Sequence, residues 1–522
     1  MKVGDRNRWL DGGKAVWPAA HTKAAMGKLL VARLPHLVFI AALWMCSRAQ
    51  AEIRLASVFS DHMVVQRGEP VHVWGWGDAG EKGEVNFRAQ TASFTVDDLG
   101  RWSVYLPGGA AGGPFDMAIR ADHPLAIKDV LVGDVWLASG QSNMQFKMDD
   151  RLADGPAEIA AAHFPKIRLM TVTDKFADHP LEDAAVSPWS VCTPETVRTF
   201  SAIAYFFGRD LNRSQDVPIG LIDSSWGGTP AEAWTSLGAL ASDSALTPVF
   251  AARADMMDKL ATGQRTQAMV DRVNPARKAK GEPPLEVPWR PDPNTWAPSA
   301  LFNAMIAPLT PLPIRGVIWY QGESNTDPLR APSYARLFRA MITDWRDKWS
   351  RPELPFLFVQ LANFKNKDDW PQVREAQRKA LVLRGTGMAV AIDLGEADNI
   401  HPANKQEVGR RLALLARHQV YRENVEDAGP TLFSATPEAG SMVVRFTHAE
   451  GLNAHGGALK GFEVAGQDGV FHPGEATIAG DTVRVQSDQA KHPVAVRYGW
   501  ANNPSCNLFN RSDLPAAPVT SE

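Results

Sequence analysis

Four polar clusters that contain glycine follow apolar runs of strand length in this sequence. They span residues 139–144, 223–229, 319–325 and 393–402. Among their side chains are a serine hydroxyl, an imidazole, carboxylates and amides, which are the groups that acyl transfer through a serine nucleophile requires. Ligands of a parallel α/β sheet bind beyond the carboxyl ends of its strands, so we expect the clusters to meet at one edge of a sheet.

Ser142 is the predicted nucleophile, and His401 is the predicted general base that activates it. Asp398 lies three residues before His401. At that spacing its carboxylate can fold back to accept the imidazole Nδ1 proton, hold the productive tautomer and stabilise the imidazolium. Rival candidates stay open for two of these roles: Ser224 and Ser225 as the nucleophile, and Asp393 as the orienting acid.

The tetrahedral intermediate of acyl transfer needs N–H donors aimed at its oxyanion. The backbone N–H of Ser142 is one candidate. Gly227 or Gly228 permits the close backbone approach that a second donor needs. A side-chain amide, from Gln321 or Asn325, is the candidate for a third donor.

Four more side chains are expected to contact substrate or to brace the loops: Gln141, Asn143, Trp226 and Glu323. Asn143 is expected to hold the nucleophile turn together, and Glu323 to brace its own loop. Each piece alone has a structural explanation, because a serine after a strand is usually a helix cap and a Gly-Gly pair is often only a turn. Glu323 and Glu396 as a pair would suit a glycosidase, but Glu396 has no predicted role. The combination of clusters favours acyl transfer.

Two familiar site patterns are absent from the sequence. The segment Gly140-Gln141-Ser142-Asn143-Met144 lacks the second glycine of the G-x-S-x-G elbow of α/β hydrolases. There is no H-E-x-x-H motif or comparable metal triad, and Cys192 and Cys506 have no nearby histidines, so no metal site is predicted. Whether these two cysteines form a disulfide or remain buried thiols stays open.

The charges of the chain nearly cancel, with 55 basic and 58 acidic side chains and a net charge of -3. This balance gives no electrostatic footprint for nucleic acid or for an anionic membrane, so neither is an expected partner. Substrate recognition must therefore come from a local site. The chain also has 17 tryptophans. Their rings either stack on sugars or fill cores and interfaces, and both interpretations stay open.

The elements that must position the clusters differ along the chain. Residues 52–127 hold short strands between Gly- and Asp-rich turns, which predicts a β-sandwich-like region. Residues 128–428 alternate apolar runs with helical patterns, which predicts a catalytic α/β domain with a mostly parallel sheet. Residues 429–522 return to strands and turns and predict a β-rich C-terminal region.

Within the α/β region, strands are predicted at residues 130–138, 219–222, 317–320, 356–360 and 388–392. Helices are predicted at residues 202–212, 334–349 and 372–383. Residues 237–297 are richer in charge and proline. We interpret them as helices and a long excursion from the same domain.

Residues 1–51 are predicted to be a leader that contains a signal peptide. Lys28 and Arg33 precede an apolar run at residues 37–45, and Ala49-Gln50-Ala51 offers a small-x-small cleavage site. The run is too short to span a bilayer, so no stable membrane insertion is expected after cleavage. The protein is therefore expected to be exported, to the periplasm or outside the cell.

These segments together resemble the sialate O-acetylesterase family, a carbohydrate-esterase branch of the SGNH hydrolases. The resemblance lies in residues 140–144, 224–230, 319–325 and 398–402, with further family-like stretches at residues 59–66 and 497–504. It covers nearly all of the chain after residue 51. It implies a flavodoxin-like SGNH hydrolase core with a parallel sheet, and β-rich N- and C-terminal regions.

For the site, the resemblance implies a triad of Ser142, His401 and Asp398 and no cofactor. The GDSL-type first block of the wider superfamily is here Gly140-Gln141-Ser142-Asn143. This departure leaves the third oxyanion donor open between Gln321 and Asn325.

The expected function is hydrolysis of O-acetyl esters on carbohydrates by a serine esterase, with an acetylated sugar or oligosaccharide as the substrate. One alternative is an acetylesterase of plant polysaccharides such as xylan or xyloglucan. The other is a non-catalytic carbohydrate-binding protein on the same scaffold. The sequence does not indicate the sugar hydroxyl or the oligomeric state.

Overall fold

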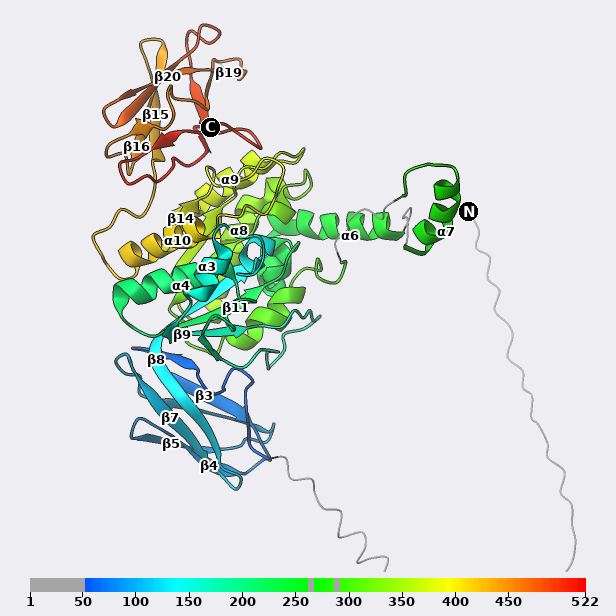
Figure 1. Cartoon of the computed structure of the whole chain (residues 1–522), viewed down its shortest axis with the longest axis vertical. Coiled ribbons are helices and arrows are strands. Elements are labelled where there is room, and N and C mark those ends of the chain that lie inside the picture. The colour runs from blue at the N-terminus through cyan, green and yellow to red at the C-terminus, as the bar shows by residue number, and fades with distance from the viewer. Residues whose placement is uncertain (1–51, 262–266, 286–291) are drawn as a thin grey trace, which may run out of the picture. The chain divides into compact units, whose positions relative to one another are not determined.

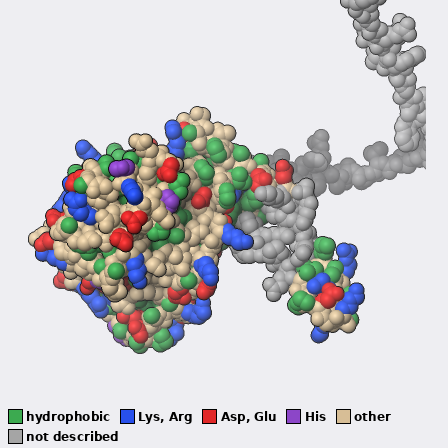
Figure 2. All heavy atoms as spheres, turned by 90° about the horizontal axis from the view of Figure 1, so that it is seen from above, with side chains coloured by type: hydrophobic (Ala, Val, Ile, Leu, Met, Phe, Trp, Pro, Cys, Tyr) green, Lys and Arg blue, Asp and Glu red, His purple; other side chains and the backbone are tan. Residues whose placement is uncertain are grey.

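The computed structural model describes residues 52–522 except 262–266 and 286–291. The predicted signal peptide and its cleavage site at Ala49-Gln50-Ala51 lie outside the described residues. Within the described ranges, no helix is both long and apolar enough to cross a membrane. On the face drawn in Figure 2, basic and acidic side chains are interspersed, in keeping with the near balance of charge in the sequence.

The N-terminal region consists of short antiparallel strands in two sheets around a shared core. The first sheet has the order β1 (Arg54–Leu55), β3 (Val71–Trp76) and β6 (Arg101–Leu106). The second contains β4 (Lys82–Phe87), β5 (Gln90–Thr95) and β7 (Gly112–Arg120). Phe94 of β5 and Trp102 of β6 stack across the two sheets with ring centroids 4.1 Å apart. The alternating pattern of the strands therefore buries one face of each sheet, as predicted.

One long strand, β8 (Leu125–Gly140), belongs to both the N-terminal region and the central sheet (Figure 1). Its first part pairs antiparallel with β7, and its last part lies parallel to β11 (Ile219–Ser225) and β12 (Gly316–Tyr320). The short strand β2 (Val64–Gln66) runs parallel beside the middle of β8. The domain boundary predicted between residues 127 and 128 thus falls within a continuous strand.

The central sheet has the strand order β10-β9-β11-β8-β12-β13-β14. Its remaining strands are β9 (Phe164–Thr171), β10 (Ser190–Cys192), β13 (Phe356–Gln360) and β14 (Thr386–Val390). Each strand from β9 to β14 is parallel to its neighbour, whereas β10 is antiparallel to β9. All five predicted strands are present, so the α/β class with a mostly parallel sheet is confirmed. β9 was not predicted, because Pro165, Lys166 and Arg168 interrupt its apolar pattern.

Helices cover the sheet and connect its strands. α4 (Ala202–Gln215) contacts α10 (Lys405–Gln419), and α8 (Ala331–Lys348) contacts α9 (Trp370–Lys379). The three predicted helices are confirmed, with α9 running into the 3₁₀ turn η6 (Ala380–Val382). At the start of α10, the Asn404 side chain accepts a hydrogen bond from the Glu407 N–H at 3.0 Å. This cap fixes where α10 begins, four residues after His401.

Helices and a long excursion were predicted for residues 237–297, and the described part of this range contains three α-helices. They are α5 (Leu237–Ala241), α6 (Thr247–Ala261) and α7 (Gln267–Ala279).

The C-terminal region has its own hydrophobic core, built from residues such as Val444, Val464 and Val483. One sheet has the order β15 (Thr431–Glu438), β16 (Ser441–Thr447), β21 (Thr482–Gln486) and β20 (Glu475–Ala479). The other has the order β19 (Phe471–Pro473), β18 (Phe462–Ala465), β22 (Ala495–Tyr498) and β24 (Val519–Thr520). The buried guanidinium of Arg374 on α9 donates to the carbonyls of Ala501 and Asn502, both at 2.7 Å. These hydrogen bonds attach the β-rich region to the α/β domain.

Cys192 and Cys506 are free thiols in the structure. Cys192 lies on β10 and is buried, and burial raises the pKa of its thiol to about 12. Burial likewise raises the pKa of Cys506 to about 11. Both thiols therefore stay protonated at neutral pH, which makes them poor nucleophiles and metal ligands.

Candidate active site

The turn after β8 positions Ser142, and glycine is required at the residue where it begins. Gly140 has φ +136°, and a Cβ there would lie 2.1 Å from the Tyr320 carbonyl oxygen on β12. The Gln141 N–H donates to that same oxygen at 2.9 Å. Because the chain is held so tightly against β12, the short helix α2 (Ser142–Gln145) starts at once and Ser142 occupies its first position.

The structure brings Ser142 and His401 together although 259 residues separate them in the sequence. The Ser142 Oγ and the His401 Nε2 are 2.8 Å apart, within hydrogen-bond distance. Both side chains are only partly buried. A serine paired in this way with an imidazole has the geometry of an activated nucleophile and its general base.

The loop that carries His401 is held by two side chains just before it. Asn399 accepts a hydrogen bond from the His401 N–H at 3.0 Å and donates to the His401 carbonyl at 2.8 Å. Glu396 accepts from the Asn399 amide at 3.0 Å and from the Ala403 N–H at 2.8 Å. These hydrogen bonds hold the pKa of Glu396 below its usual value, the Ala403 N–H contributing most. Glu396, which had no predicted role, thus closes the loop around the histidine.

The structure does not bring the predicted carboxylate to the imidazole. Asp398 is exposed, and no hydrogen bond joins it to His401 among the described residues. The rival Asp393 is held elsewhere, by two 2.7 Å hydrogen bonds from the Arg411 guanidinium. Asp150, which was not predicted, is the carboxylate whose charge acts to raise the His401 pKa.

The two rival serines on β11 are buried and bonded away from His401. Ser224 Oγ donates to the Met305 carbonyl at 3.0 Å. Ser225 Oγ donates to Asp223 at 2.5 Å. Each of these serine residues is at most 4% exposed. A substrate therefore cannot reach their hydroxyls as it can reach that of Ser142.

The predicted glycine pair lies against the serine. A Cβ on Gly227 would lie 3.2 Å from the Ser142 Cβ, so this close approach depends on glycine. The Gly227 N–H donates to the Gln145 Oε1 at 2.8 Å. Gly228 has φ +71°, and its carbonyl accepts from the Trp296 indole at 2.6 Å. Trp226 is partly buried, and its N–H donates to the Gly140 carbonyl at 3.0 Å.

The two predicted side-chain amide donors hold each other in a buried network. Gln321 Nε2 donates to Asn325 Oδ1 at 2.7 Å and to the Thr229 carbonyl at 3.2 Å. Asn325 Nδ2 donates to Glu232 at 2.8 Å, and its Oδ1 also accepts from the Ala231 N–H at 2.9 Å. Both protons of the Gln321 amide are therefore in use. In this arrangement the pair braces the loop that follows Gly228.

Gln141, Asn143 and Glu323 brace the nucleophile turn. The Gln141 Oε1 accepts from the Ser324 N–H at 3.2 Å. The Asn143 Nδ2 donates to Glu323 Oε1 at 2.6 Å and to the Ile400 carbonyl at 3.0 Å, which links the serine turn to the residue before His401. On its other side, the Asn143 Oδ1 accepts a short hydrogen bond from the Lys405 Nζ.

Lys405 is a residue of the candidate site that the sequence interpretation missed. Its ammonium is buried, lies 4.7 Å from the centroid of the Phe146 ring, and stands at the first position of α10. A lysine at a helix N-terminus faces the positive end of the helix dipole. That mismatch, four residues after a candidate histidine, is the sequence signal that could have identified it.

Burial and charge together set the protonation of the site. Burial lowers the pKa of Lys405 to about 7, against the opposing pull of Glu323, Glu396 and Asp150. Burial also lowers the pKa of His401, and the charge of Lys405 lowers it further. Burial raises the pKa of Glu323. A lowered pKa keeps the His401 imidazole neutral near pH 7, which is the form that can accept the serine proton.

Ser142 and His401 open onto a depression of about 730 Å³. The rest of its lining comes from the segment just after the nucleophile: Gln145, Phe146, Lys147, Asp149, Asp150 and Arg151. Two of these side chains are basic and two are acidic, so the charges around the opening balance. Apart from Phe146, the lining side chains carry polar groups that can bond to a hydroxylated substrate.

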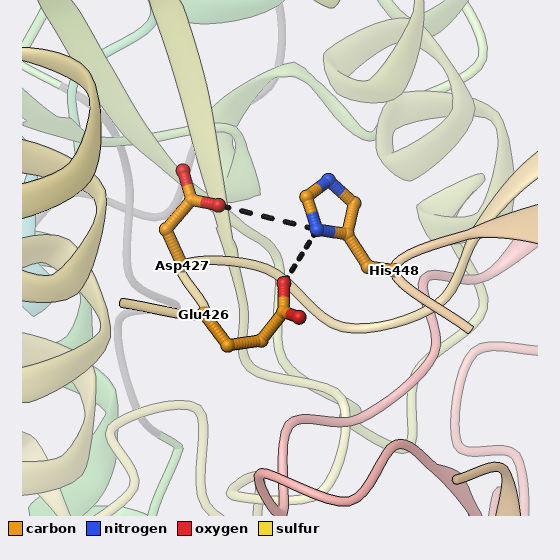
Figure 3. Close-up of side chains that lie close together, drawn as sticks. All are labelled: Glu426, Asp427 and His448. Atoms are coloured by element: carbon orange, nitrogen blue, oxygen red, sulfur yellow. Dashed lines mark hydrogen bonds and ion pairs between the residues drawn. The ribbon is translucent and has the colours of Figure 1, made fainter. Parts of the chain in front are cut away.

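One cluster with the residue types of a metal site lies elsewhere. Glu426 and Asp427, in the segment after α10, face His448 after β16 (Figure 3). The His448 Nδ1 is 2.6 Å from Glu426 and 4.0 Å from Asp427. Asp427 also accepts from the Gln419 amide at 3.0 Å. These contacts join the segment after α10 to the segment after β16.

Comparisons with known proteins bear on this arrangement. A family model described as carbohydrate esterase, sialic acid-specific acetylesterase, matches residues 277–417. The sialate O-acetylesterases of Pongo abelii and Homo sapiens are each 31% identical to this chain, over 92% of it and 95% of their own length. A solved structure of a carbohydrate acetylesterase from Xanthomonas citri is 38% identical and covers 90% of this chain and 100% of its own, with a TM-score of 0.79. The similarity therefore includes the β-rich regions as well as the central sheet.

Proposed function

The chain belongs to the sialate O-acetylesterase family, and from that premise we propose that it hydrolyses O-acetyl esters on carbohydrates through Ser142 and His401. The observation that carries the proposal is the 2.8 Å contact between the Ser142 Oγ and the His401 Nε2 at the mouth of an open depression. An esterase activity on carbohydrates is what the family and the Xanthomonas citri structure have in common. We assign the parallel sheet to a flavodoxin-like SGNH hydrolase core on the same grounds.

The proposed reaction begins with proton transfer from Ser142 Oγ to His401 Nε2 as the oxygen attacks the acetyl carbonyl carbon. The tetrahedral intermediate collapses, the bond to the sugar oxygen breaks, and His401 returns the proton to that oxygen. Water then attacks the acetyl-serine with His401 as base, and acetate leaves as Ser142 regains its proton. This is the two-step course of serine hydrolases.

The proposed oxyanion donors are backbone amides. The Ser142 N–H stands at the first turn of α2, where helix N–H groups have no partner within the helix. A second donor comes from the Gly227–Gly228 turn, where the Gly227 N–H would exchange its hydrogen bond to the Gln145 Oε1 for one to the oxyanion. Gln321 and Asn325 then support this turn from behind instead of contacting the oxyanion.

Asp398 remains the proposed orienting acid. It is exposed and has no hydrogen bond among the described residues, so its carboxylate is free to turn toward the Nδ1 of His401. Catalytic hydrogen bonds are often long or poorly aligned in unliganded enzymes and tighten in the substrate complex. Asp150 is the alternative, since it lines the depression and acts electrostatically on His401.

The proposed substrate is an acetylated sugar or oligosaccharide. The relatives are sialate O-acetylesterases, which supports acetylated sialic acid. Acetylated plant polysaccharides are the second candidate, because the balanced charges around Ser142 offer no excess of cations to a sialic acid carboxylate. Acetate release from acetylated sialosides, xylan oligosaccharides and xyloglucan oligosaccharides separates the two.

The mechanism is tested by Ser142→Ala and His401→Ala on p-nitrophenyl acetate. Each change should lower kcat by about 10⁴-fold or more while the melting temperature stays near that of the wild type. A fluorophosphonate should label the wild type at Ser142 and leave Ser142→Ala unlabelled. Full turnover in either variant would refute the assignment of Ser142 and His401. A wild type that the fluorophosphonate does not label would favour a carbohydrate-binding protein on the same scaffold.

We also propose that the chain is exported. The support is the sequence of residues 28–51, in which basic residues are followed by an apolar run and then by small residues at a cleavage site. N-terminal sequencing of the mature protein should give a start at Glu52, and a cytoplasmic product that retains residues 1–51 would contradict the proposal.

A further inference from the structure

A second cavity, which shares no lining residue with the Ser142 depression, opens on the N-terminal β region. It encloses about 580 Å³, which lies within the range of small-ligand sites. β3 and β6 form one wall, and residues 181–182 and 307–311 border it. We call this space the β3–β6 cleft.

The register of β3 and β6 places four aromatic rings on the face that points away from the sandwich core. On β3, the buried Val71 and Val73 alternate with His72, Trp74 and Trp76. Tyr105 of β6 lies directly opposite His72 in the antiparallel pair. The outer face of such a sheet is usually polar, so an outward row of aromatic rings requires an explanation.

Three of these rings form a continuous stack that ends at the surface. His72 lies between Trp74 and Tyr105, with ring centroids 4.8 Å and 4.3 Å away, and its ring is nearly parallel to that of Tyr105, at 6°. The His72 Nδ1 donates to the Pro311 carbonyl at 3.0 Å, which holds the stack in place. Trp74 is 8% exposed, but Tyr105 is 63% exposed. Tyr105 therefore presents a rigid aromatic face to solvent.

The cleft also offers hydrogen-bonding groups that the protein does not use. Within the described residues, no hydrogen bond engages the indole N–H groups of Trp74 and Trp76 or the hydroxyls of Ser103 and Tyr105. None of these atoms is a buried group without a partner either, so all can reach solvent. Aromatic faces rimmed by free polar donors suit a ligand with an apolar face and a rim of hydroxyls.

The charged groups at the cleft are each engaged within the protein. Arg101 pairs with Glu182 at 3.2 Å, and Asp97 accepts from the backbone N–H groups of Leu99 and Arg101, each at 2.9 Å. Burial lowers the pKa of His72, which keeps that ring neutral at pH 7. An anionic ligand would find no free cation among the lining residues, so the cleft favours an uncharged one.

We propose that the β3–β6 cleft binds a neutral glycan chain, with one pyranose ring stacked on Tyr105 and its hydroxyls bonded to the indole and hydroxyl groups around it. A pyranose ring has a face of C–H groups and a rim of hydroxyls, which matches both features of the wall. The choice of a glycan rests on the proposed carbohydrate esterase function. The cleft would thus bind the polysaccharide at a place distinct from Ser142, where the acetyl group reacts.

Isothermal titration calorimetry of the full chain with unacetylated cellohexaose and xylohexaose tests the proposal. Tyr105→Ala should weaken binding of at least one of the two by about 10-fold or more, the loss expected for one stacked ring. Tyr105→Phe keeps the ring and should stay within about 3-fold of the wild type. Turnover of p-nitrophenyl acetate should be unchanged in both variants, because Tyr105 does not line the Ser142 depression.

Phe433→Ala is the matched control, since Phe433 is also a highly exposed aromatic, at 74%, but lies on β15. It should leave binding unchanged. Equal affinity of wild type and Tyr105→Ala, or no binding of either oligosaccharide at millimolar concentration, would overturn the proposal. So would 3′-sialyllactose binding as tightly as the neutral chains with the same dependence on Tyr105. Because the probes carry no acetyl group, failure of the Ser142 mechanism would leave this measurement intact.

Discussion

Lys405 donates a hydrogen bond from its buried Nζ to the Oδ1 of Asn143, the residue next to the proposed nucleophile. Through Asn143 the ammonium is connected to the buried Glu323, at 2.6 Å from the Asn143 amide, and to the Ile400 carbonyl. The Asn143 side chain thus links the serine turn to the histidine loop and, through Lys405, to α10. The same cation lies close enough to His401 to lower its pKa.

Lys405→Met should move the pH profile of the reaction. In the wild type the charge of Lys405 disfavours the imidazolium and keeps His401 unprotonated to lower pH. Because the pKa of Lys405 is itself about 7, it carries this charge on the acidic side of neutrality. Removing it raises the His401 pKa, so the acidic limb of kcat/KM for p-nitrophenyl acetate should shift to higher pH.

Loss of a buried partner also destabilises a protein, and a double variant separates the two effects. Lys405→Met removes a cation that acts on the buried Glu323 through space and through Asn143, so the melting temperature should fall. Adding Glu323→Gln removes the carboxylate charge and should recover most of the melting temperature, but not the original pH profile. Lys460→Met, at an exposed lysine of the C-terminal region, should change neither. An unshifted acidic limb in the folded Lys405→Met enzyme would limit Lys405 to a structural role.

The two candidate carboxylates can be ranked by substitution. Asp398→Asn should lower kcat by at least about 10²-fold, because an amide cannot hold the tautomer that the imidazole needs. Asp150→Asn should lower it by less than about 10-fold, since Asp150 acts on His401 only through its charge. Steady-state kinetics on p-nitrophenyl acetate measures both. The reverse order would assign the orienting role to Asp150.

Gly227→Ala should impair catalysis without unfolding the protein. The added Cβ would lie 3.2 Å from the Ser142 Cβ and 3.1 Å from the Gln145 Oε1, which crowds the space beside the serine. We expect kcat to fall by about 10-fold or more with little change in melting temperature. Gly238→Ala in α5 is the control, because nothing lies within 4 Å of its Cβ position. That change should keep full activity and add up to about 1 kcal/mol of stability.

Much of the fold could be predicted because its cause is local. The strands of the central sheet are buried on both faces and appear as short apolar runs, and the N-terminal strands alternate because one face is buried. The boundary within β8 could not be predicted, since an apolar run has the same sequence pattern whether its neighbours come from one region or two. β9 was missed because Lys166 and Arg168 lie within it.

The site was predictable to the extent that parallel strand ends must meet. That rule predicted that Ser142, Gly227 and His401 lie together. In the structure both Gly227 and His401 lie next to Ser142. The rule could not tell which amides stay free, because the Gln321–Asn325 network depends on the Thr229 carbonyl and on Glu232. Nor could it place Asp398, whose position depends on how the Glu396–Asn399 hydrogen bonds turn the loop.

Asp223 on β11 predicts how stability depends on pH. Burial raises the pKa of this carboxyl to about 7, against the opposing hydrogen bond from Ser225. An unfolded chain would release the proton near pH 4. The folded state therefore holds one more proton between about pH 4 and pH 7, and this group makes the protein less stable as pH rises through that window.

Asp223→Asn should remove this penalty while keeping an acceptor for the Ser225 hydroxyl. Its melting temperature should match that of the wild type near pH 4, exceed it increasingly up to about pH 7, and then keep a constant margin. The margin corresponds to at most about 4 kcal/mol, from roughly 1.4 kcal/mol per pH unit. Asp98→Asn, at an exposed position, should show no such divergence. A constant difference across the whole range would mean that Asp223 is already ionised in the folded protein at low pH, and that its burial is compensated by its neighbours.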